Sequence, residues 1–285
     1  MDSAQGTAKL YIWRNQLLFL GASRIAYRSH SVVSDKLLVS LDGVMTISPN
    51  TGKPISTRSV LLKAGTSFAS LNLDTSAAVV AIYYLPPLSQ DHAALESIMT
   101  RVSDNMSYAH PQEDLLVRRL LYIRDEGLHP SETRRMLRDL IIPPALAGVV
   151  FREFDPRIVT VIQSIRETVA ENLSVQKFAA EVHLSASRLE KLFKEQIGVP
   201  ITRYRLRYRV FVGVIHLALG ESITNAALAA GFASSAHFSK SYSAIHGIAP
   251  SARFLKPPML EVLMADEVLG SGVPVVNRAA PLRVI

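Results

Sequence analysis

Cysteine is absent from this 285-residue chain, and tryptophan occurs once. A chain without cysteine has no disulfide, no thiolate metal ligand and no thiol nucleophile. Residues 1–6 lack the basic region followed by a long apolar run that defines a signal peptide, and no stretch has the length and hydrophobicity of a membrane span. These absences lead us to expect a protein of the reducing cytoplasm.

Acidic residues are scarce in one part of the chain only. The whole chain carries a net charge of +7, and residues 156–256 contain 13 Lys or Arg against 6 Asp or Glu. Residues 1–155 are nearly balanced, with 16 against 15. The basic segment predicts a polyanionic partner bound in a salt-dependent way. An anionic membrane surface would favour a single basic amphipathic helix instead, so no membrane partner is expected.

The basic segment contains the same helical pattern twice, 48 residues apart. In both copies apolar residues follow the i, i+3, i+4, i+7 spacing of one helix face: Val175, Phe178, Ala179 and Val182, then Ile223, Ala226, Ala227 and Ala230. A short turn and a second helix with one apolar and one polar face follow each copy. This arrangement predicts two helix-turn-helix units, whose second helices enter the DNA major groove. An ordinary helical bundle is the alternative, but it does not explain the duplication.

Specific residues within residues 155–256 also occur in the order of a known family: Phe178-Ala179, Leu184-Ser185, Leu189, Phe193, Gly198, Tyr204, Arg209, Ser222-Ile223, Ala227, Gly231-Phe232, Ala236-His237-Phe238-Ser239, Gly247 and Pro250. On these residues the segment resembles the DNA-binding domain of the AraC/XylS family of bacterial transcription regulators. The resemblance implies a sequence-specific regulator that is not an enzyme and needs no cofactor. It also implies a homodimer on double-stranded promoter DNA that contacts RNA polymerase when it activates.

The early, outward residues of each second helix are the ones expected to reach base edges. Lys191 suits guanine O6 or N7, Glu190 suits a cytosine amino group, and the Ala236 methyl suits a thymine methyl. The short side chains of the second unit predict a contact that depends more on phosphates and DNA shape. The predicted DNA-binding residues are Ser187, Arg188, Glu190, Lys191 and Lys194 in the first unit, and Ser235, Ala236, Ser239 and Lys240 in the second.

The segment between the two units is predicted to be a helix, as the resemblance also implies. Its arginines alternate as in a strand, but the apolar residues Leu206, Val210, Val214 and Leu217 have helical spacing. We expect Arg203 and Arg207 to contact phosphates and Arg209 to brace the two halves. Gly213, where the family usually has alanine, predicts a bend. A rigid connection would hold the recognition helices about 34 Å apart, one turn of DNA.

The first half of the chain predicts an α+β architecture when joined to the helical C-terminal domain. Residues 10–85 contain short apolar runs separated by turns, typical of an antiparallel sandwich or small barrel, with a hairpin at Asp42-Gly43. Residues 90–150 read as three helices. The resemblance implies a cupin-like barrel followed by a helical dimerisation region. We expect a β-rich sensing domain over 1–88, a helical region over 89–154, the DNA-binding domain over 155–256 and a tail over 257–285, with a helix at 259–268.

A cupin barrel raises the alternative of a metal-dependent enzyme fused to a DNA-binding module. Such an enzyme needs clustered histidines, whereas His30, His92, His110 and His129 are scattered, so no metal site is predicted. A DNA-repair methyl acceptor would need a reactive cysteine. The barrel could instead hold a small apolar effector, or be filled by its own side chains in a regulator without an effector. The candidate effector-binding residues are Tyr27, His30, Phe68 and Tyr83.

Overall fold

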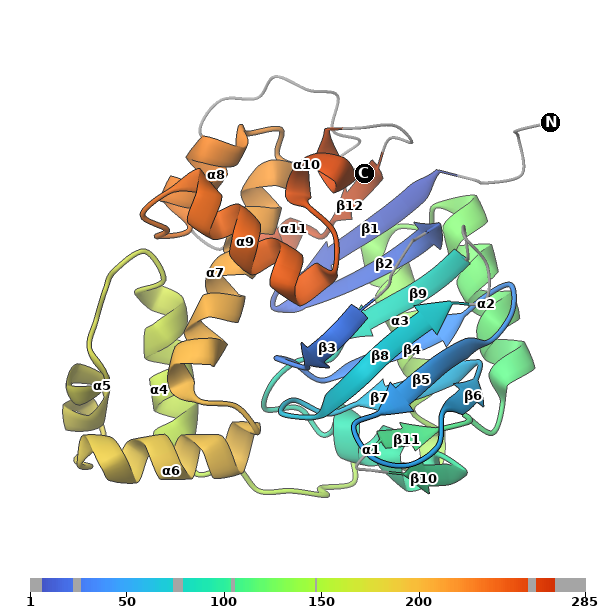
Figure 1. The fold of residues 1–285 in the computed structure, drawn as a ribbon, viewed down its shortest axis with the longest axis horizontal. Helices are drawn as coiled ribbons and strands as arrows, with labels where there is room; N and C mark the ends of the chain where they lie inside the picture. The colour runs from blue at the N-terminus through green and yellow to red at the C-terminus, as the bar shows by residue number, and fades with distance from the viewer. Residues whose placement is uncertain are drawn as a thin grey trace. The chain divides into compact units, whose positions relative to one another are not determined.

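The computed structural model describes residues 7–22, 27–73, 79–103, 106–146, 148–255 and 260–269. It divides into two compact units, which are described separately below. The first unit contains residues 1–151 together with residues 253–285, and the second contains residues 152–252. The second unit is therefore inserted, in sequence, between two parts of the first (Figure 1).

Two sheets form the first unit. The larger has the strand order β10-β11-β7-β4-β9-β2-β1-β12, and the smaller has the order β3-β8-β5-β6. The strands of the larger sheet are β1 (Ala8–Trp13), β2 (Gln16–Ala22), β4 (Lys36–Ser40), β7 (Ser59–Leu62), β9 (Val79–Tyr84), β10 (Arg101–Ser103), β11 (Met106–Tyr108) and β12 (Leu260–Met264). Those of the smaller are β3 (Tyr27–Ser31), β5 (Met45–Pro49), β6 (Ile55–Thr57) and β8 (Ser67–Leu73). This sheet unit and the helical unit confirm the predicted α+β class.

The larger sheet is covered on both faces. Every residue of β1 and of β4 is buried, whereas burial alternates along β5 of the smaller sheet. Helices α2 (Glu113–Glu126) and α3 (Pro130–Ile141) cover one face, on the far side of the sheet in Figure 1. The Trp13 indole donates to the Pro130 carbonyl at 2.9 Å, and the Tyr11 hydroxyl donates to the Ile123 carbonyl at 3.2 Å. These bonds fix both helices against β1.

The predicted hairpin at Asp42-Gly43 is wrong. Strand β4 pairs with β7 and β9, and β5 pairs with β6 and β8, so the two strands flanking this turn belong to different sheets. The Asp42 carboxylate accepts a hydrogen bond from the Val79 amide at 3.0 Å, and the Leu41 amide donates to the Val79 carbonyl. These bonds hold the turn to β9 while the chain crosses between the sheets.

Three helices follow β9, as predicted, but the first is shorter than its apolar pattern suggests. Helix α1 (Asp91–Ile98) ends before Val102, which lies in β10 and is 67% exposed. Helices α2 and α3 follow, and a short 3-10 turn, η1 (Pro144–Leu146), comes after them. Strands β10 and β11 pair antiparallel between α1 and α2, an element that the sequence pattern did not reveal.

The tail returns to the first unit as a strand, so the helix predicted over residues 259–268 is wrong for residues 260–264. Strand β12 pairs parallel with β1, and Lys9 forms an ion pair with Glu261 at 2.7 Å. The short helix α11 (Asp266–Leu269) follows, and its Glu267 accepts from Arg134 of α3 at 3.1 Å. An unpaired edge of β1 and a complementary charge explain why this segment is extended.

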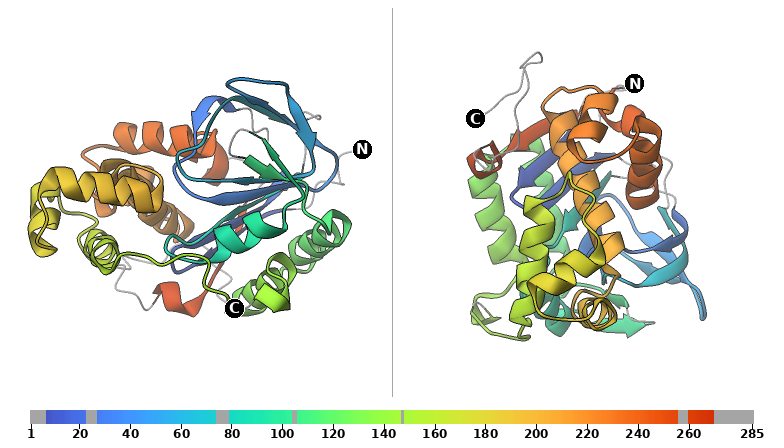
Figure 2. Two further views of the ribbon diagram at one scale, coloured as in Figure 1. Left: turned by 90° about the horizontal axis from the view of Figure 1, so that it is seen from below. Right: turned by 90° about the vertical axis from the view of Figure 1, so that its left-hand side faces the viewer.

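The second unit is entirely helical (Figure 2). Its helices are α4 (Pro156–Glu167), α5 (Val175–Glu181), α6 (Ala186–Ile197), α7 (Ile201–Ala218), α8 (Ile223–Ala229) and α9 (Ser235–His246); α10 (Pro250–Phe254) follows at the boundary. No helix among the described residues is long and apolar enough to span a bilayer.

Candidate nucleic-acid interface

Helices α5 and α6 form the first helix-turn-helix unit. Serine side chains cap both helices: Ser174 accepts from the Lys177 amide and Ser185 from the Arg188 amide, each at 3.3 Å. Each cap satisfies an amide that has no partner within its helix. His183 provides the turn between the helices with a φ of +54°, and Gly198 ends α6 with a φ of +86°.

Helices α8 and α9 repeat this construction. The Ser222 hydroxyl accepts from the Asn225 amide at 3.1 Å, and the Ser234 hydroxyl accepts from the His237 amide at 3.2 Å. Gly231 has a φ of +79° at the position equivalent to His183, and Gly247 ends α9 with a φ of +72°. Helices α6 and α9 each contain 12 residues between a capping serine and a left-handed glycine. We call these two the recognition helices.

Aromatic side chains set the orientation of each recognition helix. In α6 the buried face includes Phe193, whose ring meets that of Tyr204 edge-on at 5.5 Å between centroids. In α9 the Phe238 ring meets that of Phe232 at 5.3 Å, again nearly edge-on. Such pairs favour one geometry over others. They fix which residues of each helix point outward.

The exposed face of α6 contains all the residues predicted for it: Ser187, Arg188, Glu190, Lys191 and Lys194 are exposed. In α9, Ala236 and Lys240 are exposed, while Ser235 and Ser239 are half-buried. The first recognition helix therefore presents three cations and two carboxylates, Glu190 and Glu195, to solvent, and the second presents one lysine and His237 among small side chains. The charge available for phosphates and guanine edges is concentrated on α6.

Two arginines of α7 hold the loop between α4 and α5. The Arg205 guanidinium donates to the carbonyls of Leu173 at 2.5 Å and Glu171 at 3.0 Å. Arg209 donates to the Val169 carbonyl at 2.9 Å, the Glu171 carbonyl at 2.7 Å and the Asn172 side chain at 3.0 Å. These bonds satisfy carbonyls at the end of α4 and before α5. Sequence reasoning assigned a bracing role to Arg209 and missed Arg205, whose i, i+4 spacing from Arg209 was the available signal.

Arg203 and Arg207 differ in their surroundings, although both were predicted to contact phosphates. Arg203 is exposed near the start of α7. Arg207 is 8% exposed, with its guanidinium 5.3 Å from the centroid of the Tyr204 ring. The structure therefore corrects the expectation for Arg207, because its side chain packs on an aromatic ring instead of reaching solvent.

Two glycines permit close packing inside the second unit. A Cβ at Gly231 would lie 2.7 Å from the Ala170 Cα, so the second helix-turn-helix turn approaches the α4–α5 loop as only glycine allows. A Cβ at Gly213 would lie 2.5 Å from a ring carbon of Phe238. Helix α7 continues through Gly213 from Ile201 to Ala218, so the glycine makes room for Phe238 within an unbroken helix.

His237, at the start of α9, has a mixed environment. Its ring meets that of Phe232 at 5.2 Å, yet the residue is exposed. It lies beside Ala236 at the start of α9, on the part of the helix that the predicted contacts occupy. The sequence around His237 did not predict that this residue is exposed.

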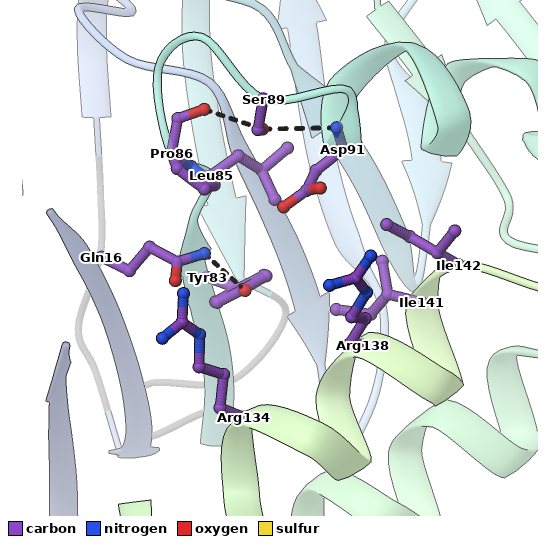
Figure 3. A pocket seen from close by; sticks show the side chains of 10 residues that line it. All are labelled: Gln16, Tyr83, Leu85, Pro86, Ser89, Asp91, Arg134, Arg138, Ile141 and Ile142. Carbon is purple, nitrogen blue, oxygen red and sulfur yellow. Dashed lines mark hydrogen bonds between the residues drawn. The ribbon is translucent and has the colours of Figure 1, made fainter. Parts of the chain in front are cut away.

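Of the predicted effector-binding residues, His30 of β3 and Phe68 of β8 are register partners in the smaller sheet, whereas Tyr83 belongs to the larger sheet. Phe68 is buried in β8, and Tyr83 is buried in β9 on the face toward α3 (Figure 3). The side chains of Tyr27 and His30 lie outside the described residues. The first unit also contains Lys36, buried in β4, and burial lowers the pKa of its ammonium group to about 8. Among the described residues no three His, Asp or Glu side chains are placed to hold a metal ion.

Comparisons with known proteins agree with this geometry. A family described as a helix-turn-helix domain matches residues 178–254. The HTH-type transcriptional regulator MtrA of Neisseria gonorrhoeae is 26% identical over 106 residues, which are 37% of this chain and 35% of that protein. The chain thus matches about a third of the length of this relative.

Solved structures of ToxT from Vibrio cholerae share the fold. The apo form of a ToxT variant with one substitution has a TM-score of 0.58 at 17% identity, over 84% of this chain and 96% of that one. A structure of wild-type ToxT with a bound unsaturated fatty acid has a TM-score of 0.54 at 14% identity, over the same shares of both chains. At these sequence identities the similarity to ToxT is one of fold alone.

Proposed function

We propose that this chain, whose C-terminal domain is a helix-turn-helix domain of the AraC type, is a sequence-specific DNA-binding transcription regulator. The observation that carries the proposal is the repeated construction of α6 and α9. Each is a serine-capped, glycine-terminated helix with a buried aromatic face and an exposed polar face. Two such helices in one domain suit adjacent segments of one major groove.

The two recognition helices have different tasks in this proposal. Helix α6 reads bases, with Lys191 donating to guanine and Glu190 accepting from cytosine, because both side chains are exposed and long enough to reach base edges. Helix α9 presents short side chains, so Ser235, Ala236 and Ser239 make close contacts with the groove while Lys240 contacts phosphate. Arg203, exposed at the start of α7, adds a phosphate contact.

The partners follow from the same proposal. The regulator binds promoter DNA as a homodimer, with the helical part of the first unit as the dimer contact, and contacts RNA polymerase when it activates. Tyr122 of α2, 46% exposed, supports a role for this helix in association. The first unit responds to a small molecule or a protein partner. The ToxT structure with a bound fatty acid supports a sensing role for a unit of this fold.

The test is selection of binding sites from a randomised duplex library by the full chain. We expect a defined sequence motif and an affinity that falls steeply between about 50 and 200 mM salt, since phosphate contacts release counterions. Fluorescence anisotropy with the selected duplex and a scrambled duplex of equal length measures both. Equal affinity for the two duplexes at every salt concentration would contradict the proposal.

A further inference from the structure

A cavity of about 220 Å³ lies in the first unit between β9 and α3 (Figure 3). Strand β2 contributes Gln16, β9 contributes Tyr83, and the start of α1 contributes Asp91. The volume equals that of about seven water molecules, which is room for an organic molecule of about nine non-hydrogen atoms.

Two buried polar groups at its floor have unused hydrogen-bonding capacity. The Gln16 amide donates to the Tyr83 hydroxyl at 2.9 Å. Gln16 is only 3% exposed, and its Oε1 atom has no hydrogen-bond partner among the described residues. Burial raises the pKa of Tyr83, so its hydroxyl keeps its proton. The floor therefore offers one acceptor and one donor to a ligand, and a buried acceptor without a partner is unfavourable until one arrives.

Charged groups of both signs line the walls. Arg134 and Arg138 lie one turn apart on α3; the Arg138 guanidinium is on the side of the cavity where the Asp91 carboxyl lies, and the Arg134 guanidinium is on the side of the Gln16 amide (Figure 3). Arg134 is held by Glu267 at 3.1 Å, whereas Arg138 forms no hydrogen bond or ion pair with the described residues. Among the described residues no ion pair joins Asp91 to either arginine. Burial raises the pKa of Asp91 while the two arginines lower it, as expected for a carboxylate near cations without a direct partner.

The remaining walls are apolar and include Leu85 and Ile141. We propose that the cavity binds a small zwitterionic α-amino acid with an apolar side chain, about the size of leucine. The carboxylate accepts from Arg138 and from the Tyr83 hydroxyl, the ammonium group donates to Asp91 and to Gln16 Oε1, and the side chain lies against Leu85 and Ile141. This inference names a ligand for the sensing role proposed above. The binding itself rests on the cavity, and only a regulatory effect of the ligand rests on the proposed function.

Other small-molecule classes suit these groups less well. A simple carboxylic acid leaves Asp91 and Gln16 Oε1 without a donor, and a simple amine leaves the Arg138 guanidinium without an acceptor. A phosphate ester brings two negative charges close to Asp91. Of these classes, only a zwitterion carries both a negative group for Arg138 and a positive group for Asp91.

Isothermal titration calorimetry on the full chain without DNA tests the proposal. The probes are L-leucine, 4-methylpentanoate, which lacks the amino group, and 3-methylbutylamine, which lacks the carboxylate. We expect saturable binding of L-leucine at one site per chain and at least tenfold weaker binding of each analogue. Arg138→Gln and Asp91→Asn should each weaken L-leucine binding at least tenfold. Arg135→Gln, an equal change on the exposed face of α3 outside the cavity, should leave it unchanged.

Equal binding of the three probes, or full L-leucine affinity in both cavity variants, would overturn the proposal. Thermal unfolding of each variant shows that it is folded, and anisotropy with the selected duplex is measured on the same samples. If the parent chain binds the selected duplex but not L-leucine, the cavity assignment alone is rejected. If the parent chain binds L-leucine but no duplex, the regulator function is rejected and the amino-acid site is supported.

Discussion

Three kinds of residue lead to predictions at the scale of single residues: exposed residues proposed to contact DNA, residues in close packing, and buried ionisable groups. Lys191 is exposed on α6, Gly231 stands where a side chain cannot fit, and Lys36 is an ammonium group inside the sheet core. Because their physical roles differ, substitutions at these residues should change different measured properties.

Replacing Lys191 by alanine should weaken binding to the selected duplex by about 1–3 kcal/mol and relax the preference at one base pair. The reason is the loss of a donor to a guanine edge. Lys53→Ala makes the same charge change on an exposed residue of the first unit and should leave both the affinity and the motif unaltered. A repeated site selection with the Lys191 variant that returns the parental motif would reject the base contact.

Replacing Gly231 by alanine should destabilise the second unit by about 2 kcal/mol or more, because φ is +79° and the new Cβ meets the Ala170 backbone. Gly43→Ala is the matched control, since a Cβ there has nothing within 4 Å. Chemical denaturation measures both. Equal stability of the two variants would show that the close approach at Ala170 is absent in solution.

Lys36 predicts a pH dependence with a definite sign. Its pKa is about 8 in the folded chain against 10.5 for the ordinary group, so the unfolded chain binds more protons between these values. The stability contributed by this site should therefore rise from about pH 8 to pH 10.5, by up to about 3 kcal/mol. Lys36→Met should be more stable than the parent at neutral pH and should lose this rise. Parallel stability curves for parent and variant over that range would contradict the assignment.

At the scale of elements, α7 connects the two helix-turn-helix units through contacts on different sides. Arg205 and Arg209 hold the α4–α5 loop, and Gly213 receives the ring of Phe238 from α9. The same helix begins near exposed Arg203. Bracing therefore uses Arg205 and Arg209, whereas the phosphate contact proposed for this helix uses Arg203.

This division predicts opposite phenotypes for two equal substitutions. Arg209→Met should cost about 2–3 kcal/mol of stability, because three charged hydrogen bonds are lost and two carbonyls lose a donor. Arg203→Met should keep its stability but bind the selected duplex more weakly, with the salt slope reduced by about 1. Denaturation and salt-dependent anisotropy separate the two effects. The assignment fails if Arg203→Met lowers stability and leaves the salt slope unaltered.

At the scale of the whole molecule, the chain leaves the first unit, forms the second and returns. Strand β12 supplies the edge of the larger sheet beside β1, and Glu261 and Glu267 pair with Lys9 and Arg134. In sequence, the helical unit is thus joined at both of its ends to the unit that carries the cavity.

Ending the chain after residue 256 should lower the unfolding midpoint of the first unit and promote self-association, because β1 becomes an open edge. Thermal unfolding and light scattering over a range of concentrations measure both. Glu261→Gln, which removes the ion pair but keeps the strand, should have a smaller effect on the midpoint and none on association. A shortened chain that stays monomeric with an unchanged midpoint would show that β12 is dispensable.

Local signals in the sequence were enough for the helical unit. Apolar stripes and the short turns between them operate within a few residues, and they predicted α5, α6, α8 and α9 together with the outward face of α6. The false hairpin at Asp42-Gly43 and the false helix at residues 260–264 have one cause. Both segments take their conformation from distant partners, Val79 and β1, that no local window contains.

The amino-acid sequence by itself determined the two helix-turn-helix units, the basic surface and the absence of any thiol chemistry. Only the tertiary structure decided that the tail completes the first unit, that Arg207 turns to Tyr204, and that Gln16, Asp91 and Arg138 meet at one cavity. Helical periodicity and capping are short-range properties of the chain, whereas strand pairing, burial of a charge and the walls of a cavity depend on residues far apart in sequence.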